Sequence, residues 1–234
     1  MENIEKNIKL VLQQIHVAEQ KYQREMGSVS LLAVSKTQPT NIIKMAISAG
    51  LMDFGENYLQ EALPKIQELG RYQPNWYFIG PVQSNKTRQI AENFDWVLTV
   101  DKEKIAMRLG DARPPELGPL NICIQINISG EESKSGAGLS DIDSLIPLIM
   151  EHPQLRLRGL MGIPALETKL HDQRSSLRQL REIFESMQKR GVPVDTLSMG
   201  MSNDLEAAIA EGATMVRIGT SIFGQRINNK KNIR

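Results

Sequence analysis

Apolar residues follow two kinds of pattern along the chain: a helical spacing and short β-rich runs. In residues 3–22 they lie three or four positions apart, which predicts an amphipathic helix. The side chains concerned are Ile4, Ile8, Val11, Ile15 and Ala18. After this segment come short runs rich in β-branched and aromatic residues, which predict strands. These eight runs span residues 29–35, 52–57, 75–81, 95–101, 120–129, 155–164, 195–202 and 214–224.

Segments with helical periodicity separate the short runs. In residues 39–50, Pro39 stands at the first turn and Gly50 at the end, as helix termini favour. Further helices are predicted at residues 58–69, 84–94, 102–112, 139–152, 169–191 and 203–212. Strands that alternate with helices indicate parallel βαβ units. The pattern therefore predicts a (β/α)8 TIM barrel with an extra N-terminal helix, with an open doubly wound sheet as the alternative, because periodicity alone does not show closure.

Composition narrows the class of protein. The 234 residues carry a formal net charge of +1, with basic and acidic residues interleaved, so nothing indicates nucleic acid as a partner. The single cysteine, Cys123, excludes an internal disulfide and fits a reducing compartment. No signal peptide and no apolar run long enough to span a bilayer is evident, so we expect a soluble cytoplasmic protein without membrane contact. We expect one domain over residues 1–226 and a disordered basic tail over 227–234.

The reactive groups of a TIM barrel lie where its strands end. Lys36 directly follows the first run, and the second run ends on Asn57. An amine that attacks a carbonyl group must be neutral, and burial at a barrel mouth lowers the pKa of a lysine toward that state. Lys36 is therefore a candidate for Schiff-base chemistry, with a surface lysine as the alternative.

The last two runs end in residues suited to phosphate. Gly200 precedes Ser202, and Gly219 precedes Thr220, so the backbone can approach a ligand closely beside a hydroxyl group. Loops at these two positions frequently bind phosphate in TIM barrels. Helix capping by Ser202 or Asn203 explains the first of these sequences equally well.

Arg217 and the three histidines are the other residues with possible chemistry. Arg217 lies on the same side of its strand as Met215, and it needs an acceptor if that side is the barrel interior; an outward arginine against a helix is the alternative. The three histidines fall in predicted helices, which argues against Ser–His, Cys–His and metal chemistry. A lysine with a phosphate site leaves two classes: a sugar-phosphate aldolase, or a pyridoxal phosphate protein.

Several stretches resemble one family closely. They are LLAVSKTQP, FGENYLQE, NWYFIGPVQSNK, QINISGEESKSG, LRLRGLMGIP and LSMGMSNDLEAAIAEGATMVRIGTSIFG. Together they are similar to the YggS-type (PROSC-like) pyridoxal phosphate homeostasis proteins over residues 1–226. The resemblance implies the alanine-racemase-like barrel, fold type III among proteins that bind pyridoxal 5'-phosphate (PLP). It also implies a role in vitamin B6 homeostasis and amino-acid balance without robust enzymatic activity.

The resemblance also implies a set of cofactor-binding residues. Lys36 holds PLP as a Schiff base, Arg217 faces the pyridine nitrogen, and Asn57 lies near the cofactor. The phosphate is held by the loops after the last two strands. The corresponding residues are Ser202, Gly219 and Thr220, with Met199 and Gly200 adjacent.

Two features make a non-catalytic role reasonable. Arg217 is always charged and keeps the ring nitrogen unprotonated, which makes the cofactor a weak electron sink. Barrel racemases take a second acid/base group, a tyrosine, from another domain across a dimer, and the sequence offers no such motif. We therefore expect a monomeric PLP carrier with no catalytic residue, which delivers PLP to apoenzymes. A weak racemase or lyase is the alternative. Lys134 is a hypothetical acceptor of the aldehyde in transfer, or simply a solvated loop lysine.

Overall fold

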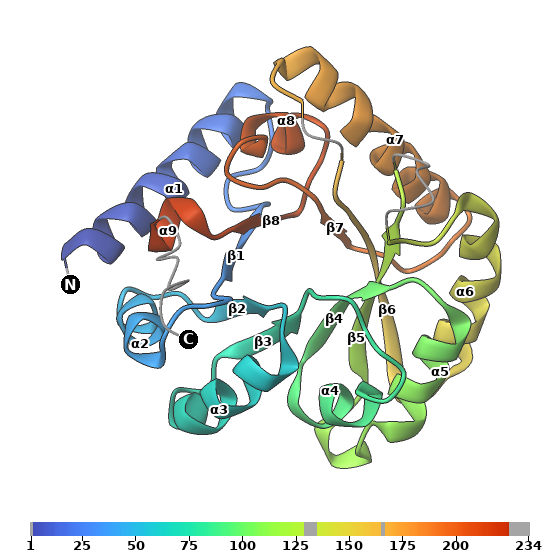
Figure 1. Ribbon diagram of the computed structural model, residues 1–234. Helices are drawn as coiled ribbons and strands as arrows, with labels where there is room; N and C mark the ends of the chain where they lie inside the picture. The colour runs from blue at the N-terminus through green and yellow to red at the C-terminus, as the bar shows by residue number, and fades with distance from the viewer. Residues whose placement is uncertain (1, 129–134, 165–166, 225–234) are drawn as a thin grey trace, which may run out of the picture.

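Eight parallel strands close into a barrel in which each strand pairs with its neighbours in sequence and β8 pairs with β1 (Figure 1). The computed structural model describes residues 2–128, 135–164 and 167–224. The strands are β1 (Ser30–Val34), β2 (Asp53–Glu56), β3 (Asn75–Phe78), β4 (Trp96–Val100), β5 (Leu120–Ile126), β6 (Leu155–Gly162), β7 (Thr196–Ser198) and β8 (Met215–Ile218). Each strand lies within a predicted run. Because β8 pairs with β1, the sheet is closed, so the predicted TIM barrel is confirmed and the open-sheet alternative was wrong.

Helices cover the outside of the barrel. They are α1 (Glu2–Lys21), α2 (Thr40–Ser48), α3 (Leu59–Leu69), α4 (Thr87–Asn93), α5 (Glu103–Ala112), α6 (Leu139–Glu151), α7 (Leu170–Lys189), α8 (Leu205–Ala210) and α9 (Thr220–Phe223), with 3₁₀ turns at Gly70–Tyr72 and Pro115–Leu117. The extra N-terminal helix is confirmed, and it lies beside α8 and α9 (Figure 1). One prediction was wrong: residues 220–223 of the last predicted strand form α9 instead. The predicted tail and Lys134 lie outside the described residues.

Two separate apolar clusters hold the fold together. The larger lies between the strands and the helices and includes the buried face of α1, with Ile8, Val11 and Ile15 almost fully buried. Burying one such side chain stabilises the fold by about 1.5–3 kcal/mol. The smaller cluster fills the barrel interior and consists of Leu32, Tyr77, Leu98, Cys123, Met161 and Met215. Cys123 is therefore a buried core residue, and burial raises the pKa of its thiol.

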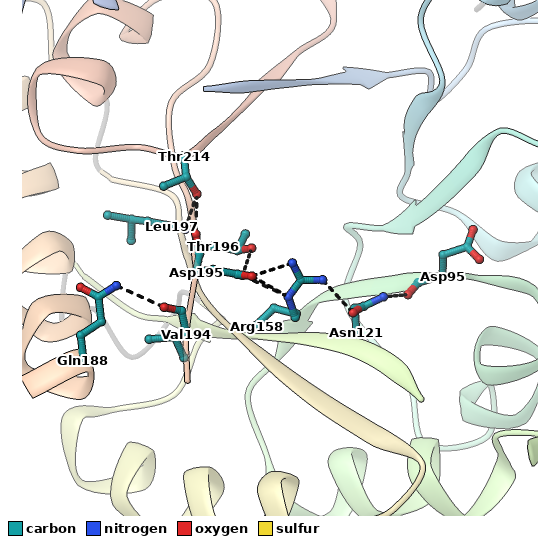
Figure 2. A network of polar contacts seen from close by, with 9 residues as sticks. All are labelled: Asp95, Asn121, Arg158, Gln188, Val194, Asp195, Thr196, Leu197 and Thr214. Carbon is teal, nitrogen blue, oxygen red and sulfur yellow. Dashed lines mark hydrogen bonds and ion pairs between the residues drawn. The ribbon is translucent and has the colours of Figure 1, made fainter. Parts of the chain in front are cut away.

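A polar network closes the N-terminal end of the barrel (Figure 2). Arg158 donates from Nη2 to Asp195 Oδ2 at 2.7 Å and from Nη1 to Asn121 Oδ1 at 3.0 Å. Its guanidinium carbon also lies 4.4 Å from the centre of the Trp96 ring, and Trp96 stacks on Tyr77. Groups at this end of a TIM barrel serve stability. A ligand site is therefore expected at the C-terminal end of the barrel.

In the described part of the chain, no helix is long and apolar enough to cross a membrane.

Candidate functional site

A cavity of about 530 Å³ lies at the C-terminal end of the barrel. Its lining comes from the ends of β1, β2, β3, β6 and β8 and from the loops that follow β6, β7 and β8. Six of the eight residues implied by the resemblance line it, namely Lys36, Asn57, Ser202, Arg217, Gly219 and Thr220. The closure of the barrel explains this gathering, because pairing of β8 with β1 brings the two ends of the fold together.

Met199 and Gly200 do not line this cavity. Met199 is fully buried in the cluster between strands and helices. Gly200 has a φ of +96°, and a Cβ there would lie 2.5 Å from Cβ of Ala208. This glycine therefore lets the loop after β7 pass close against α8, and its carbonyl oxygen accepts the N–H of Arg217.

Lys36 lies in a tight turn directly after β1. The N–H of Gln38 donates to the carbonyl oxygen of Ser35 at 3.0 Å, which closes the turn Ser35–Gln38. Thr37 has a φ of +65°, which is a strained value for a β-branched residue and costs about 1–3 kcal/mol. Lys36 is half-buried and lines the cavity. Such strain gathers at functional sites, so the turn is a candidate for the reactive centre.

Arg217 faces the barrel interior and is 5% exposed. Its Nη1 donates to the carbonyl oxygen of Ser198 at 2.7 Å and to Ser198 Oγ at 2.9 Å, and its Nη2 donates to the carbonyl oxygen of Gly162 at 3.0 Å. Burial lowers the pKa of Arg217 to about 10, with the charge of Asp204 opposing the shift, so the guanidinium stays charged at neutral pH. The arginine is thus a fixed, preorganised cation in the cavity wall.

In the loop after β7, Ser202 and Asn203 do not cap the following helix. The helix α8 begins at Leu205, and its N-cap is Asp204, so the capping interpretation of Ser202 and Asn203 was wrong. Asp204 Oδ1 accepts the N–H of Met201 at 2.6 Å and fixes the loop. Ser202 and Asn203 are exposed and line the cavity. The loop therefore offers the cavity a hydroxyl and an amide that helix capping does not occupy.

Carboxylates near this loop do not all face the cavity. Glu206 accepts hydrogen bonds from Lys21 at 2.7 Å and Tyr22 at 2.9 Å, on the α1 side of α8. The hydrogen bond from Lys21 holds the pKa of Glu206 below its usual value. Asp204 does line the cavity, and burial raises the pKa of its carboxyl group. The repulsion that Glu206 would exert on a bound phosphate is thus reduced by its cationic partner.

The loop after β8 adds further donors. Gly219, Thr220 and Ser221 line the cavity, and α9 begins at Thr220. The first N–H groups of a helix have no acceptor within it, so they are available to an anion beside the two hydroxyls. Gly219 also packs against the end of β1, where a Cβ would lie 3.3 Å from the carbonyl oxygen of Val34. This close approach places the loop next to Lys36.

Asn57 supplies an acceptor. Its Oδ1 atom is buried and has no hydrogen-bond partner within the described residues. A buried acceptor without a donor is rare in native proteins and indicates a missing ligand or water. The cavity thus combines an amine, a guanidinium, hydroxyls and a buried amide oxygen, and this set fits a phosphorylated, polar aromatic aldehyde such as PLP.

Several lining residues were not among the predicted cofactor-binding residues. Met201, Asn203 and Ser221 neighbour predicted residues, and Ile163 and Pro164 lie at the end of the predicted run 155–164, directly after β6. Gln38 lies in the Lys36 turn. Glu167 lies in the segment before α7, and Gln173 lies near the start of α7. Gln173 Nε2 donates to the carbonyl oxygens of Glu167 and Asn203. A helical glutamine carries no sequence signal for a barrel-mouth site, so only the three-dimensional arrangement reveals it.

The described lining residues hold few acid/base groups. They include the carboxyl groups of Glu167 and Asp204 but no histidine, cysteine or tyrosine, and their only amine is that of Lys36. No group of three or more histidine, cysteine or acidic side chains is arranged to hold a metal ion anywhere in the ranges 2–128, 135–164 and 167–224. The chemistry of this cavity therefore centres on the lysine.

Comparison with known proteins agrees with this geometry. Residues 10–227 match the family described as alanine racemase, N-terminal domain. The chain is 53% identical over 226 residues to a pyridoxal phosphate homeostasis protein of Pseudomonas aeruginosa, with 97% of each chain covered. It is 52% identical over 234 residues to the protein of that name from Escherichia coli K12, covering 99% of this chain and all of the other.

Solved structures agree as well. PipY of Synechococcus elongatus PCC7942, solved with PLP bound, superposes with a TM-score of 0.83 at 32% identity, covering 94% of this chain and all of PipY. Alanine racemase of Corynebacterium glutamicum has a TM-score of 0.68 at 15% identity over 99% of this chain and 63% of the racemase, which shows a shared fold. The chain therefore belongs to the family of pyridoxal phosphate homeostasis proteins, built on the barrel of the alanine racemase N-terminal domain.

Proposed function

We propose that this chain binds PLP in the cavity at the C-terminal end of the barrel and serves the intracellular homeostasis of this cofactor. The observation that carries the proposal is the meeting of Lys36, Arg217 and the loops after β7 and β8 in one cavity. The relatives named above, and PipY with PLP bound, support it.

Lys36 is proposed to hold PLP covalently. PLP supplies an aldehyde, and the Nζ atom of a lysine condenses with it to a Schiff base, with release of one water molecule. Lys36 is suited to this role because it is the only amine among the described lining residues and because its turn is held rigidly after β1.

The phosphate group is proposed to lie between the loops after β7 and β8. The hydroxyls of Ser202, Thr220 and Ser221 and the backbone N–H groups beside Gly219 are donors on that side of the cavity. Several such donors together favour a phosphate dianion over a neutral group. Arg217 adds a positive charge to the same wall. Met199 and Gly200 directly follow β7 and do not line the cavity, so they are proposed to support this loop from behind.

Arg217 is also proposed to suppress catalysis. A guanidinium that remains charged donates hydrogen bonds and does not accept them, so a ring nitrogen opposite it stays unprotonated. The unprotonated ring withdraws electrons weakly. Apart from the carboxyl groups of Glu167 and Asp204, the described lining also holds no histidine, cysteine or tyrosine as a second acid/base group. Both features support a binding protein without robust enzymatic activity.

The proposed role includes transfer of PLP to apoenzymes by a monomeric protein. An exposed rim supports this: Thr37, Ser202 and Thr220 are exposed at the cavity, where a recipient protein or solvent has access.

A ligand comparison tests the proposed binding mode. The protein is titrated with PLP, with pyridoxal, which has the aldehyde without the phosphate, and with pyridoxine phosphate, which has the phosphate without the aldehyde. We expect PLP to bind most tightly, and each of the other two to bind at least about tenfold more weakly, because each loses one anchor. Equal affinity for PLP and pyridoxal would remove the proposed phosphate site. Racemisation of L-alanine at about 1 s⁻¹ or faster would contradict the non-catalytic role.

A further inference from the structure

A buried ion pair lies directly behind the Lys36 turn, on the outer face of the barrel. Glu56 of β2 is fully buried, and its Oε1 accepts a hydrogen bond from Lys65 Nζ of α3 at 2.8 Å. The Lys65 side chain is 8% exposed. Neither residue lines the cavity. The pair therefore belongs to the packing between α3 and the sheet, where apolar residues normally stand.

Both members of the pair bind Ser35, the residue before Lys36. Lys65 Nζ donates to the carbonyl oxygen of Ser35 at 3.0 Å, and Ser35 Oγ donates to Glu56 Oε1 at 2.6 Å. The same Ser35 carbonyl oxygen accepts the N–H of Gln38 and closes the turn. The lysine thus holds the oxygen around which the turn is built.

A second side chain of α3 reaches the other half of the turn. Glu61 Oε2 accepts the N–H of Thr37, the residue with the strained φ of +65°, at 3.1 Å. Glu61 and Lys65 are four residues apart, so they lie on neighbouring turns of one helix face. Lys36 stands between the two residues that α3 holds.

Stability alone does not explain this arrangement. A buried ion pair often adds no more to the free energy of unfolding than a well-packed apolar pair of similar volume, because removing both charges from water carries a large desolvation penalty. Glu56 Oε2 is moreover buried without a hydrogen-bond partner in the described part of the chain. In α3, Lys65 occupies the sheet-facing position that follows Leu59 and Ala62 and precedes Leu69. A leucine there would pack without these costs.

We propose that Glu56, Lys65 and Glu61 form a clamp that positions Lys36 by holding the strained turn Ser35–Gln38 from outside the cavity. They are positioning residues, since none of them lines the cavity. The inference rests on the proposed function of Lys36 as the PLP-binding lysine, but it predicts a property of the turn that does not require PLP. Helix α3 thereby influences the reactivity of Lys36 from outside the cavity.

The first test uses the protein without PLP. Lys65→Met and the double variant Glu56→Gln/Lys65→Met are compared with the wild type by amide hydrogen exchange at Thr37 and Gln38, whose N–H groups bond within the clamp. We expect exchange at both amides to accelerate by about tenfold or more in both variants. The double variant leaves no buried charge unpaired, so its melting temperature should stay near the wild type. Unchanged exchange in the double variant would overturn the proposal.

A matched control comes from an ion pair between α3 and the neighbouring helix α2. Lys44 and Glu68 form an ion pair of 2.6 Å between α2 and α3, but it is partly exposed at 34% and 49% of the side chains. Lys44→Met removes the same chemistry away from the turn. We expect it to leave exchange at Thr37 and Gln38 unchanged, and an acceleration equal to that of Lys65→Met would contradict a specific clamp.

The second test measures Lys36 itself. PLP is titrated into the same variants, the visible absorbance gives the Schiff-base equilibrium, and borohydride followed by peptide mapping gives the modified residue. We expect the double variant to form the Lys36 adduct about tenfold less favourably, and Lys65→Arg to recover part of the loss. An unchanged equilibrium despite faster exchange would overturn the positioning role. If wild-type Lys36 took up no PLP, the proposed function would fail, while the exchange data would still decide whether the clamp exists.

Discussion

Gly219 and Val34 approach so closely that a β-carbon at position 219 would lie 3.3 Å from the Val34 carbonyl oxygen. This contact joins the end of β8 to the end of β1, two strands at opposite ends of the chain that pair in the closed barrel. It places the hydroxyl-bearing loop Gly219–Ser221 beside the turn that carries Lys36. The proposed anchors for the two ends of PLP are therefore neighbours because the barrel closes.

Gly219→Ala tests this contact. The added methyl group forces the two strand ends apart by a few tenths of an ångström, so the loop shifts relative to Lys36. We expect the dissociation constant for PLP to rise about tenfold, which corresponds to about 1.4 kcal/mol. Fluorescence or absorbance titration measures it. Gly70→Ala is the control, because nothing lies within 4 Å of the added carbon and its backbone is helical, and this variant should bind PLP like the wild type.

Arg217→Met should destabilise the fold as well as the site. The substitution leaves the carbonyl oxygens of Ser198 and Gly162 without their donor inside the barrel. An unpaired buried acceptor costs about 1–3 kcal/mol, so we expect a loss of at least about 2 kcal/mol in the free energy of unfolding. Urea denaturation measures it. The exposed Arg156 of β6 is the matched control, and Arg156→Met should change stability by no more than about 0.5 kcal/mol. Equal effects of the two substitutions would contradict the interior role of Arg217.

A substitution at Met199 tests whether residues outside the cavity lining contribute to PLP binding. Its side chain is fully buried away from the cavity, although the family resemblance places it next to the phosphate. Met199→Leu keeps the volume of the side chain, so we expect a stability loss below about 1.5 kcal/mol. The affinity for PLP should stay within about twofold of the wild type. A tenfold weaker affinity with intact stability would show that Met199 contributes to the site directly.

Glu211 should make the acid stability of the protein depend on α7. Its carboxylate is fully buried and accepts hydrogen bonds from Arg174 at 2.7 Å and Arg178 at 3.3 Å, with Arg181 at 2.8 Å as a third ion-pair partner. Burial alone would raise the pKa of Glu211, but the three arginines outweigh it and hold the pKa below its usual value. A carboxyl group with a lowered pKa in the folded state stabilises above its unfolded pKa of about 4.3, and that stabilisation disappears as the pH falls through the folded pKa.

The measurement is the free energy of unfolding from pH 7 to pH 3. At pH 7 we expect Glu211→Gln to cost about 1.5–3 kcal/mol, and the difference from the wild type should shrink steadily below about pH 4.3. Glu185→Gln on the same α7 helix removes a half-exposed partner of Arg181 and should cost less than about 1 kcal/mol at any pH. A difference for Glu211→Gln that stays constant down to pH 3 would contradict the assigned pKa direction.

Much of the fold was readable from the sequence, because each strand is a short β-rich run between helical segments. Residues 220–223 were missed because TSIF has strand-like composition, while the chain after Gly219 turns into the short helix α9. The start of α8 was misplaced because Ser202 and Asn203 are good N-caps, yet Asp204 holds the loop and the helix begins at Leu205. Local propensity cannot decide between adjacent capping residues that tertiary contacts select.

The lining of the candidate cavity was readable in part. Lys36 and Asn57 follow their strands, and the barrel places strand ends together. Gln173 comes from a helix that the fold brings over the cavity, so no local pattern marks it. Lys65 lies on the buried face of α3, and its pairing with Glu56 becomes apparent only when α3 packs on β2. Contacts between distant segments are the part that periodicity does not specify.

Borohydride trapping decides whether Lys36 holds PLP as a Schiff base. The protein is mixed with PLP, its visible spectrum is recorded, and borohydride is added before peptide mass mapping. We expect an absorbance band of a protonated Schiff base that borohydride bleaches, with the cofactor mass fixed on the peptide that carries Lys36. Lys36→Ala should show neither, while circular dichroism confirms its fold. Cofactor mass on a different lysine, or an unchanged adduct in Lys36→Ala, would show that Lys36 is not the residue that binds PLP covalently.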